Sequence, residues 1–191
     1  NLPTFNSHSI ECNIHRIKGL AERFIYFNDD FILNQPVHKS DFFDTLGRPI
    51  VKLEEYGVVN PSHAKFTNKD FLYAANNSRN ILRENHNIRM TRLHKHIPYA
   101  HLKENIISFC EEYKTSIKAT SKARLRNNCD INLLSFAAHY YGLIKTTYVL
   151  ESNNKYSKYL LVRPSNIWKL LLNQYRYKYL CFNDGDNSSK N

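Results

Sequence analysis

The sequence predicts an α/β protein with a mixed, partly parallel sheet that is flanked by helices. Segments of helical pattern alternate with short, apolar, strand-like runs, which is the order typical of this class. The chain has 191 residues, of which 42% are hydrophobic, so it is long enough to bury a core of its own. We therefore expect one domain over residues 1–185, followed by a disordered tail over residues 186–191.

The first expected helix covers residues 7–19. Ile10, Ile14 and Ile17 recur at helical spacing, and Gly19 is a suitable C-terminal stop. The polar residues of the segment fall on a different face, and they are His8, Glu11 and His15. The pattern predicts a helix with an apolar face and a polar face.

Further helices are expected at residues 67–82, 102–113, 131–144 and 165–172. Thr67 and Asp70 resemble a capping box, and Ser165 can cap the last helix. The expected inward faces of the first two are Phe71, Ala74, Ala75, Ser78 and Leu82, then Leu102, Ile106, Phe109, Cys110 and Tyr113. Strands are expected at residues 24–27, 50–53, 146–150, 159–162 and 179–182.

The charge balance restricts the class of partner. A formal net charge of +10 favours anionic partners such as acidic lipid, nucleotide-sugars or a charged polymer. Zinc-finger spacing, RNP-type motifs and basic regions with heptads do not occur, so we expect no nucleic-acid partner. No apolar run has the length needed to cross a bilayer. The four scattered cysteines are expected to be free, buried thiols.

Two strand-like runs end in the same polar pattern. Residues 24–27 are followed by NDD at 28–30, and residues 179–182 are followed by ND at 183–184. Ligands bind outside the carboxyl ends of strands in open α/β sheets, and oxygen ligands suit Mg²⁺ or Mn²⁺ bound to a diphosphate. If the two strands are neighbours, the candidate metal ligands are Asp29, Asp30, Asn183 and Asp184. Two unrelated polar turns are the alternative.

Histidines and arginines form two further constellations. His94, His96 and His101 lie close in sequence, and a His-x-His pair on a strand can bind zinc, although no third ligand is evident. Pro98 restrains the backbone near His96, which suits a fixed catalytic base. Arg124 and Arg126 would share one face of a strand and could bind phosphate oxygens. For both constellations the alternative is a solvated loop.

Four separated motifs, in this order, closely resemble those of the Stealth family of sugar-1-phosphate transferases. The second conserved region is resembled by residues 2–11, 15–17, 19–20 and 24–30 (LPTFNSHSIE, HRI, GL and FIYFNDD). The third region is resembled by His96-Ile97-Pro98, and the stretch after it by residues 124–126, Asp130 and His139-Tyr140-Tyr141. The fourth region is resembled by residues 181–185 (CFNDG).

The resemblance implies a nucleotide-sugar-transferase-like fold and a role in capsular polysaccharide biosynthesis. Such an enzyme transfers hexose-1-phosphate or N-acetylhexosamine-1-phosphate from a UDP-sugar to a hydroxyl group of the growing polysaccharide. It forms a phosphodiester and releases UMP. The family's first region and the earlier half of the second are not found here. We therefore expect residues 1–185 to be the C-terminal part of a Stealth-type catalytic domain, incomplete without an N-terminal portion.

The resemblance also implies site residues and partners. His96 as base, Arg126 on the transferring phosphate and Asp30 on a divalent cation are the expected catalytic residues. The expected substrate-binding residues are Asn6, His8, Glu11, Arg16, Asn28 and Arg124. The expected partners are a UDP-sugar, a polysaccharide or lipid-linked oligosaccharide acceptor, and the N-terminal portion of the same enzyme. We expect a cytoplasmic protein, peripheral on the inner face of the cytoplasmic membrane.

Two alternatives stay open. The first is a metal-dependent glycosyltransferase, which would release UDP instead of UMP. The second is a non-catalytic basic module that binds an anionic polymer or a membrane, and its binding would weaken with salt and be indifferent to EDTA.

Overall fold

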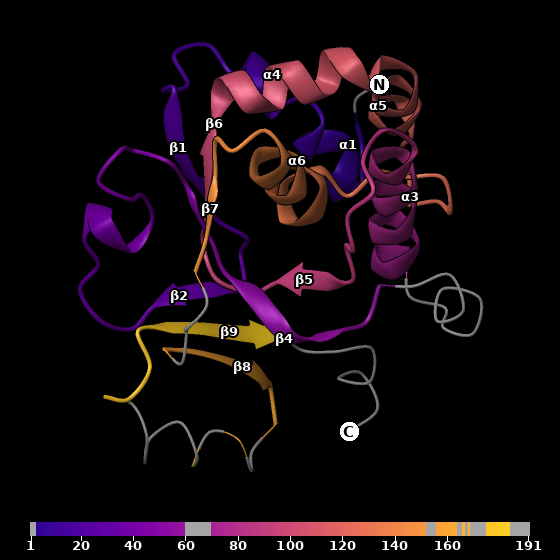
Figure 1. Cartoon of the computed structure of the whole chain (residues 1–191). Helices are drawn as coiled ribbons and strands as arrows, with labels where there is room; N and C mark the ends of the chain where they lie inside the picture. The colour runs from indigo at the N-terminus through magenta and orange to yellow at the C-terminus, as the bar shows by residue number, and fades with distance from the viewer. Residues whose placement is uncertain are drawn as a thin grey trace.

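The computed structural model describes residues 3–59, 70–151, 156–163, 166, 168 and 175–183. Helices and strands alternate along this part of the chain, so the protein is of the predicted α/β type (Figure 1). The α-helices are α1 (Ser7–Glu11), α3 (Asp70–Asn85), α4 (Lys103–Glu112), α5 (Lys114–Lys122) and α6 (Ala138–Ile144). Short helical segments are the 3-10 helices η1 (Ile14–Arg16) and η2 (Lys39–Asp41) and the π-helical segment η3 (Leu133–Ala137).

The strands are short and pair in both directions. They are β1 (Arg23–Tyr26), β2 (Phe31–Leu33), β3 (Ile50–Val51), β4 (Leu53–Gly57), β5 (Arg92–His94), β6 (Tyr99–Leu102), β7 (Val149–Leu150), β8 (Ser157–Leu161) and β9 (Tyr179–Asn183). The pairs β1–β6, β4–β5 and β2–β9 are antiparallel, whereas β3–β7 and β8–β9 are parallel. The predicted mixture of strand directions is therefore confirmed.

The single sheet that the sequence suggested is not seen in the described part of the chain. The described strands are divided among three two-stranded sheets and one three-stranded sheet, ordered β2-β9-β8. Turns explain the division, because residues 27–30 separate β1 from β2 and a one-residue break at Lys52 separates β3 from β4. Each change of direction gives the next strand a different partner.

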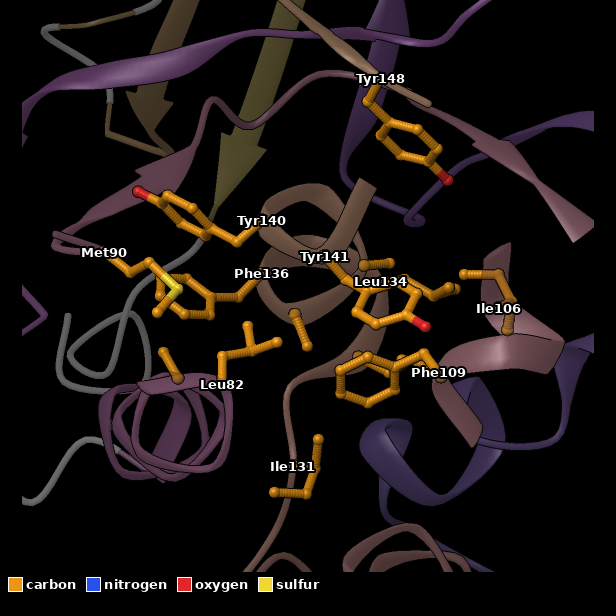
Figure 2. Close-up of a cluster of buried hydrophobic side chains, with 14 of the residues drawn as sticks. Leu82, Met90, Ile106, Phe109, Ile131, Leu134, Phe136, Tyr140, Tyr141 and Tyr148 are labelled. Carbon is orange, nitrogen blue, oxygen red and sulfur yellow. The ribbon is translucent and has the colours of Figure 1, made fainter. Parts of the chain in front are cut away.

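A helical segment that is apolar on all sides forms the centre of the core. η3 runs directly into α6, and its Leu134 and Phe136 are fully buried. Figure 2 shows Phe136 on the side of Leu82 of α3 and Leu134 on the side of Phe109 of α4. Burial of each large apolar side chain contributes about 1.5–3 kcal/mol, so this segment fixes the positions of the elements around it.

A close contact inside this core gives a stability prediction. Gly142 of α6 lies against Tyr148, and a Cβ atom at position 142 would overlap the tyrosine ring. The ring is held in place, because the Tyr148 hydroxyl accepts a hydrogen bond from the Leu102 N–H at 3.0 Å. We expect Gly142→Ala to lower the free energy of unfolding by roughly 1–3 kcal/mol, as overpacked cores do. Urea denaturation measures it, and an unchanged midpoint would contradict the prediction.

The first predicted helix is shorter than expected, and its faces are reversed. The segment folds as α1 and η1, and its helical part ends at Arg16 with Ile17 as the C-cap, so it stops before Gly19, whose φ is +80°. Ile10 and Ile17 are exposed, whereas His8 and Glu11 are buried, so the predicted apolar and polar faces are wrong. The reason is that the polar side chains find partners in the segment around Asp130 and Leu134, which satisfies them in the interior.

Most other predicted elements are confirmed, with small changes of boundary. α3 buries Ala74, Ala75, Ser78 and Leu82 as expected, but Phe71 is exposed. α4, η3 with α6, β3, β7, β8 and β9 occupy the predicted positions. The Thr67 capping box and the tail 186–191 lie outside the described residues, as does most of the helix at 165–172.

Candidate active site

Asp30 and the end of β9 lie together. Asp30 immediately precedes β2, which pairs with β9 so that Phe31 faces Cys181. The Phe182 N–H donates to the Asp30 carbonyl oxygen at 3.0 Å, which fixes the backbone of Asp30 beside the last residues of β9. The two polar endings thus meet as predicted, but through β2, because β1 pairs with β6 instead.

The Asp30 carboxylate is held on one oxygen only. Its Oδ2 accepts from the Cys181 thiol at 3.1 Å and from the Asn183 side-chain amide at 3.4 Å. Its Oδ1 is buried without a hydrogen-bond partner among the described residues. Burial raises the pKa of Cys181, with the neighbouring carboxylate adding to it, so this residue is a neutral thiol that can donate. The arrangement leaves Oδ1 as a buried acceptor.

His96 lies near this carboxylate. It stands between β5 and β6 at the centre of a tight turn, where the Ile97 N–H donates to the Lys95 carbonyl oxygen at 2.9 Å. Its ring packs edge-on against Tyr159 of β8, with 5.0 Å between ring centroids. Burial lowers the pKa of His96, and the Asp30 charge partly opposes the shift. The imidazole is therefore neutral near pH 7 and able to accept a proton.

The remaining predicted metal ligands are less closely placed. Asp29 is exposed at the turn, and its charge contributes to the raised pKa of Tyr26. Asn28 closes the same turn, since its carbonyl oxygen accepts from the Phe31 N–H at 3.2 Å. Asp184 lies outside the described residues. Among the residues that are described, no group of three or more His, Cys, Asp or Glu is arranged to hold a metal ion.

A second polar group surrounds Glu11 of α1. Glu11 is buried, and burial raises its pKa to about 7, opposed by the Leu134 N–H and the charge of Arg126. The Leu134 N–H donates to Glu11 Oε2 at 3.3 Å. Near neutral pH, Glu11 is thus present in both its protonated and its ionised form. A carboxyl group in this state, beside a guanidinium, can hold or release a proton.

Asn6 and His8 converge on Asp130, which is 1% exposed. The Asn6 side-chain amide donates to Asp130 Oδ2 at 2.9 Å, and His8 Nδ1 lies 3.5 Å from the same oxygen. Asn6 Oδ1 also caps α1 by accepting from the His8 N–H at 3.1 Å. These predicted substrate-binding residues therefore support the site from inside. Asp130 was not predicted to have a role, and only the basic stretch before it could have indicated one.

The predicted arginines lie in an irregular segment instead of a strand, so they do not share a strand face. Arg126 donates from Nη2 to Ser7 Oγ at 3.0 Å, at the start of α1. Arg124 donates from Nε to the Pro3 carbonyl oxygen at 3.2 Å. Asp130 explains the irregular path, since it accepts from the Asn127 N–H and pulls the chain into a turn. Arg16 is exposed at the end of η1, beside His15 and Cys110 and not in either polar group.

Two tyrosines lie between the two polar groups. Tyr26 and Tyr99 are cross-strand partners on β1 and β6, and their rings stack with 6.2 Å between centroids. Burial raises the pKa of Tyr99, and the charges of both Glu11 and Asp30 add to the shift. Both carboxylates therefore lie close enough to Tyr99 for their charges to act on its hydroxyl group. Its position could not be read from the sequence, where it only follows a proline.

The predicted histidine cluster divides. His94 and His101 lie apart from His96 and form a buried stack with His139 of α6. The ring centroids are 4.2 Å apart for His94 and His139, and 4.8 Å apart for His101 and His139. Stacked faces do not point ring nitrogens at one ion, so the zinc interpretation of this cluster is wrong. Burial lowers the pKa of His94 and of His101 to about 3.

The cysteines are free thiols, as predicted. Cys12, Cys110 and Cys181 are buried, whereas Cys129 is exposed in the turn before Asp130, which corrects the expectation that all are buried. Within the described residues, no helix combines the length and the apolar character needed to cross a lipid bilayer.

Comparison with known proteins supports the resemblance. Residues 1–51 match the description Stealth protein CR2, conserved region 2. The whole chain is 30% identical to the capsular polysaccharide phosphotransferase SacB of Neisseria meningitidis serogroup A and covers 36% of it. Over 98% of its length it is 34% identical to the capsular polysaccharide phosphotransferase fcs1 of Haemophilus influenzae, of which it covers 53%.

A Gram-positive relative extends the comparison. The chain is 29% identical over 97% of its length to the receptor polysaccharide phosphotransferase WefC of Streptococcus gordonii and covers 62% of it. The chain thus spans between about a third and three fifths of the length of these relatives. Its first 51 residues thus match the second conserved region of the Stealth proteins, and almost all of its length is similar to proteins named as polysaccharide phosphotransferases.

Proposed function

We propose that this chain is the C-terminal part of the catalytic domain of a sugar-1-phosphate transferase that builds capsular polysaccharide. The reaction transfers hexose-1-phosphate or N-acetylhexosamine-1-phosphate from a UDP-sugar to a hydroxyl group of the growing polysaccharide. The acceptor oxygen forms a bond to the β-phosphorus, the bond to the bridging oxygen breaks, and UMP leaves. The partners are the donor, a polysaccharide or lipid-linked acceptor, and the N-terminal portion of the enzyme.

One observation carries the proposal: a neutral, partly buried imidazole lies within electrostatic reach of a carboxylate, one oxygen of which has no hydrogen-bond partner among the described residues. His96 and Asp30 come from segments far apart in sequence, and the charge of Asp30 acts on the imidazole. Phosphoryl transfer needs a positioned base and charge stabilisation more than covalent help. His96 is suited to take the proton from the acceptor hydroxyl group. The relatives' names, which are those of phosphotransferases, agree with this chemistry.

The Asp30 group also fits a divalent cation. Asp30 Oδ1 is buried and has no hydrogen-bond partner among the described residues, and the Asn183 side-chain amide donates to the other oxygen of the same carboxylate. Oxygen donors of this kind are preferred by Mg²⁺ and Mn²⁺. We propose that Asp29, Asp30, Asn183 and Asp184 hold the cation. When bound, it would stabilise the charge that develops on the UMP leaving group.

The Glu11 group has the complementary task of holding the substrate phosphate. Arg126 is exposed, and its contact with Ser7 orients the guanidinium at the start of α1. We propose that Arg126 binds the transferring phosphate, with Arg124 and Asn28 assisting substrate binding. Asn6 and His8 support the group through Asp130. Glu11 keeps the local charge near balance, because its carboxyl group loses its proton in the neutral pH range.

The nucleotide released tests the proposal directly. The full-length protein is incubated with Mg²⁺, a panel of UDP-sugars and capsule oligosaccharides, and the products are separated by chromatography. Release of UMP is expected. Release of UDP would show a glycosyltransferase, and salt-sensitive polymer binding without any nucleotide product would show a non-catalytic module. We further propose that the reaction takes place in the cytoplasm, at the inner face of the membrane where lipid-linked acceptors are presented.

Asp30→Asn tests the cation site. The amide keeps the size of the side chain but removes its charge, so we expect Mg²⁺-dependent UDP-sugar affinity to fall at least about tenfold, a loss of roughly 1.4 kcal/mol. Calorimetry with and without EDTA measures it. Glu55→Gln, which removes an exposed carboxylate on β4, is the matched control and should bind like the wild type. An affinity for the Asp30→Asn protein equal to that of the control would contradict the prediction.

A further inference from the structure

One side of the molecule carries an uninterrupted run of positive charge. Between Tyr113 and Cys129, the charged residues are Lys114, Lys118, Lys122, Arg124 and Arg126, with no acidic residue among them. The first three belong to α5, and the two arginines follow in the irregular segment that leads to Asp130. We call the three lysines the α5 stripe.

The α5 stripe is a continuous row on one helix face. The lysines are four residues apart, which places neighbours roughly 6 Å apart along the axis. All three are exposed, and together with Thr115 and Ala119 they line a shallow surface hollow. The opposite face of the helix is fixed to the protein through buried Ile117 and Thr120. The row of charges is therefore held rigidly on a packed helix.

Two of the acidic residues near α5, Asp130 and Glu112, are engaged elsewhere. Lys114 and Lys118 form no ion pair with any residue that the structure describes. Asp130 is buried and bonded to Asn6. Glu112, at the end of α4, accepts from the Tyr141 hydroxyl at 2.9 Å and lies 3.5 Å from Lys145. Like charges four residues apart disfavour a helix, so the positive charge of α5 is kept at some cost.

The stripe leads to the phosphate end of the candidate site. α5 is tied to α1, since Ser9 Oγ donates to the Ser121 carbonyl oxygen at 2.8 Å and the Asn13 amide donates to Ser121 Oγ at 2.7 Å. The residues before α1 lie beside the end of α5, since the Phe5 N–H donates to the Arg124 carbonyl oxygen at 2.8 Å. From α5 the chain passes through Arg124 to Arg126, which contacts Ser7. A row of cations thus runs from the far end of α5 to Arg126.

We propose that the α5 stripe binds the growing polymer, a polysaccharide with one phosphodiester charge in each repeat. The inference rests on the proposed function, because sugar-1-phosphate transfer would make such a polyanion. Charge complementarity carries it: a polymer whose terminal unit reacts beside Arg126 would lay its earlier phosphates along the row of lysines. A bilayer fits less well, because α5 exposes no large hydrophobic side chain to insert into lipid.

A charge reversal tests the proposal without requiring turnover. The full-length protein is compared with a triple variant, Lys114→Glu, Lys118→Glu and Lys122→Glu. The matched control reverses three exposed lysines away from α5 with the same change of net charge: Lys18→Glu, Lys39→Glu and Lys158→Glu. The probes are fluorescent poly(glycerol phosphate) oligomers of two lengths, and fluorescence anisotropy reports binding. Vesicles containing phosphatidylglycerol form a separate arm.

The expected result depends on oligomer length. The wild type and the control bind the long oligomer at least about tenfold more tightly than the short one, and the α5 variant loses this advantage. An α5 variant with wild-type affinity overturns the proposal. So does wild-type binding of vesicles without binding of either oligomer, which would assign α5 to a membrane surface. Should the charge-reversed protein fail to fold, as judged by circular dichroism, the Lys→Gln triple variant provides the same comparison.

Failure of this inference differs from failure of the proposed function. Nucleotide release from a short acceptor depends on His96 and Asp30 and not on α5. If the α5 variant releases UMP at the wild-type rate and its products have the wild-type length, only the inference that the α5 stripe binds the polymer is contradicted. If the wild type releases no UMP, the proposed function is contradicted, whether or not the protein binds the oligomers.

Discussion

Replacing His96 by alanine in the full-length enzyme is expected to lower the rate of sugar-1-phosphate transfer by about 10²–10⁴-fold, the usual contribution of a general base. The physical reason is the loss of a neutral imidazole whose pKa is lowered by burial and which lies beside Asp30. Without it, the acceptor hydroxyl group has no proton acceptor at that point. Initial rates of UMP release, measured at saturating UDP-sugar, test the expectation.

Two comparisons make the His96→Ala result specific. The folded state is checked by thermal unfolding, because the ring also packs against Tyr159. His38→Ala removes an exposed histidine from the N-terminal boundary of η2 and should leave the rate unchanged. Normal turnover by the His96→Ala enzyme would remove this residue from the mechanism. Equal losses in both variants would point to a general effect on the fold.

The second large effect is expected from acid. His94, His101 and His139 are buried against one another, and burial lowers the pKa of each. In the unfolded chain these histidines take up protons near pH 6.5, whereas in the folded protein they stay neutral well below that pH. The unfolded state therefore binds more protons as the pH falls, and acid stabilises it relative to the folded state.

The size of the acid effect follows from the number of rings. Full stability is present above about pH 6.5 and is lost as the pH falls toward 3, the value near which His94 and His101 titrate when folded. Relative to pH 7.5, each ring that stays neutral in the folded protein lowers the free energy of unfolding at pH 5.5 by about 1.4 kcal/mol. Three such rings lower it by about 4 kcal/mol. That loss is a large part of the 5–15 kcal/mol typical of a domain. Glu11, whose pKa is raised to about 7, takes up a proton in the folded protein over the same pH range and offsets part of the loss. Urea denaturation at pH 7.5 and 5.5 measures the net change.

A variant separates the stack from the other ionisable groups. His139→Leu removes the middle ring, so the contribution of the histidines to the difference in unfolding free energy between pH 7.5 and 5.5 should fall by about 1.4 kcal/mol. Its stability at pH 7.5 serves as the reference and removes the direct cost of the substitution. A pH dependence identical to that of the wild type would show that His139 is not kept neutral by the fold.

The sequence predicted the local elements well because local patterns determine them. The apolar spacing in α3 and α4 and the composition of residues 131–144 required no knowledge of distant contacts. The repeated strand-Asn-Asp ending also pointed to Asp30 and Asn183, which do meet. The route between them was not predicted, because the turn at residues 27–30 moves the pairing with β9 from β1 to β2. Strand partners depend on the whole chain, whereas strand propensity depends on a few residues.

Burial of polar residues was the part that periodicity could not predict. In the sequence, His8 and Glu11 have the spacing of a solvent-exposed helix face. In the structure, their partners are Asp130 and the Leu134 N–H. Their partners lie more than 100 residues away, so no local window contains the pair. The same holds for the histidine stack, in which His139 joins His94 and His101 only after α6 is enclosed. Functional polar groups are commonly the places where local rules fail.

The contact between Asp30 and Asn183 has a consequence for the order of folding. It joins residues separated by 153 positions, through a strand that lies between β2 and β8. Closing so large a loop costs entropy that local helices do not pay, so contacts of this kind form slowly. The helical core can therefore be complete while the carboxylate still lacks its neighbours. Ligand affinity at Asp30 would then report the last stage of maturation, which spectroscopic signals from the helices would miss.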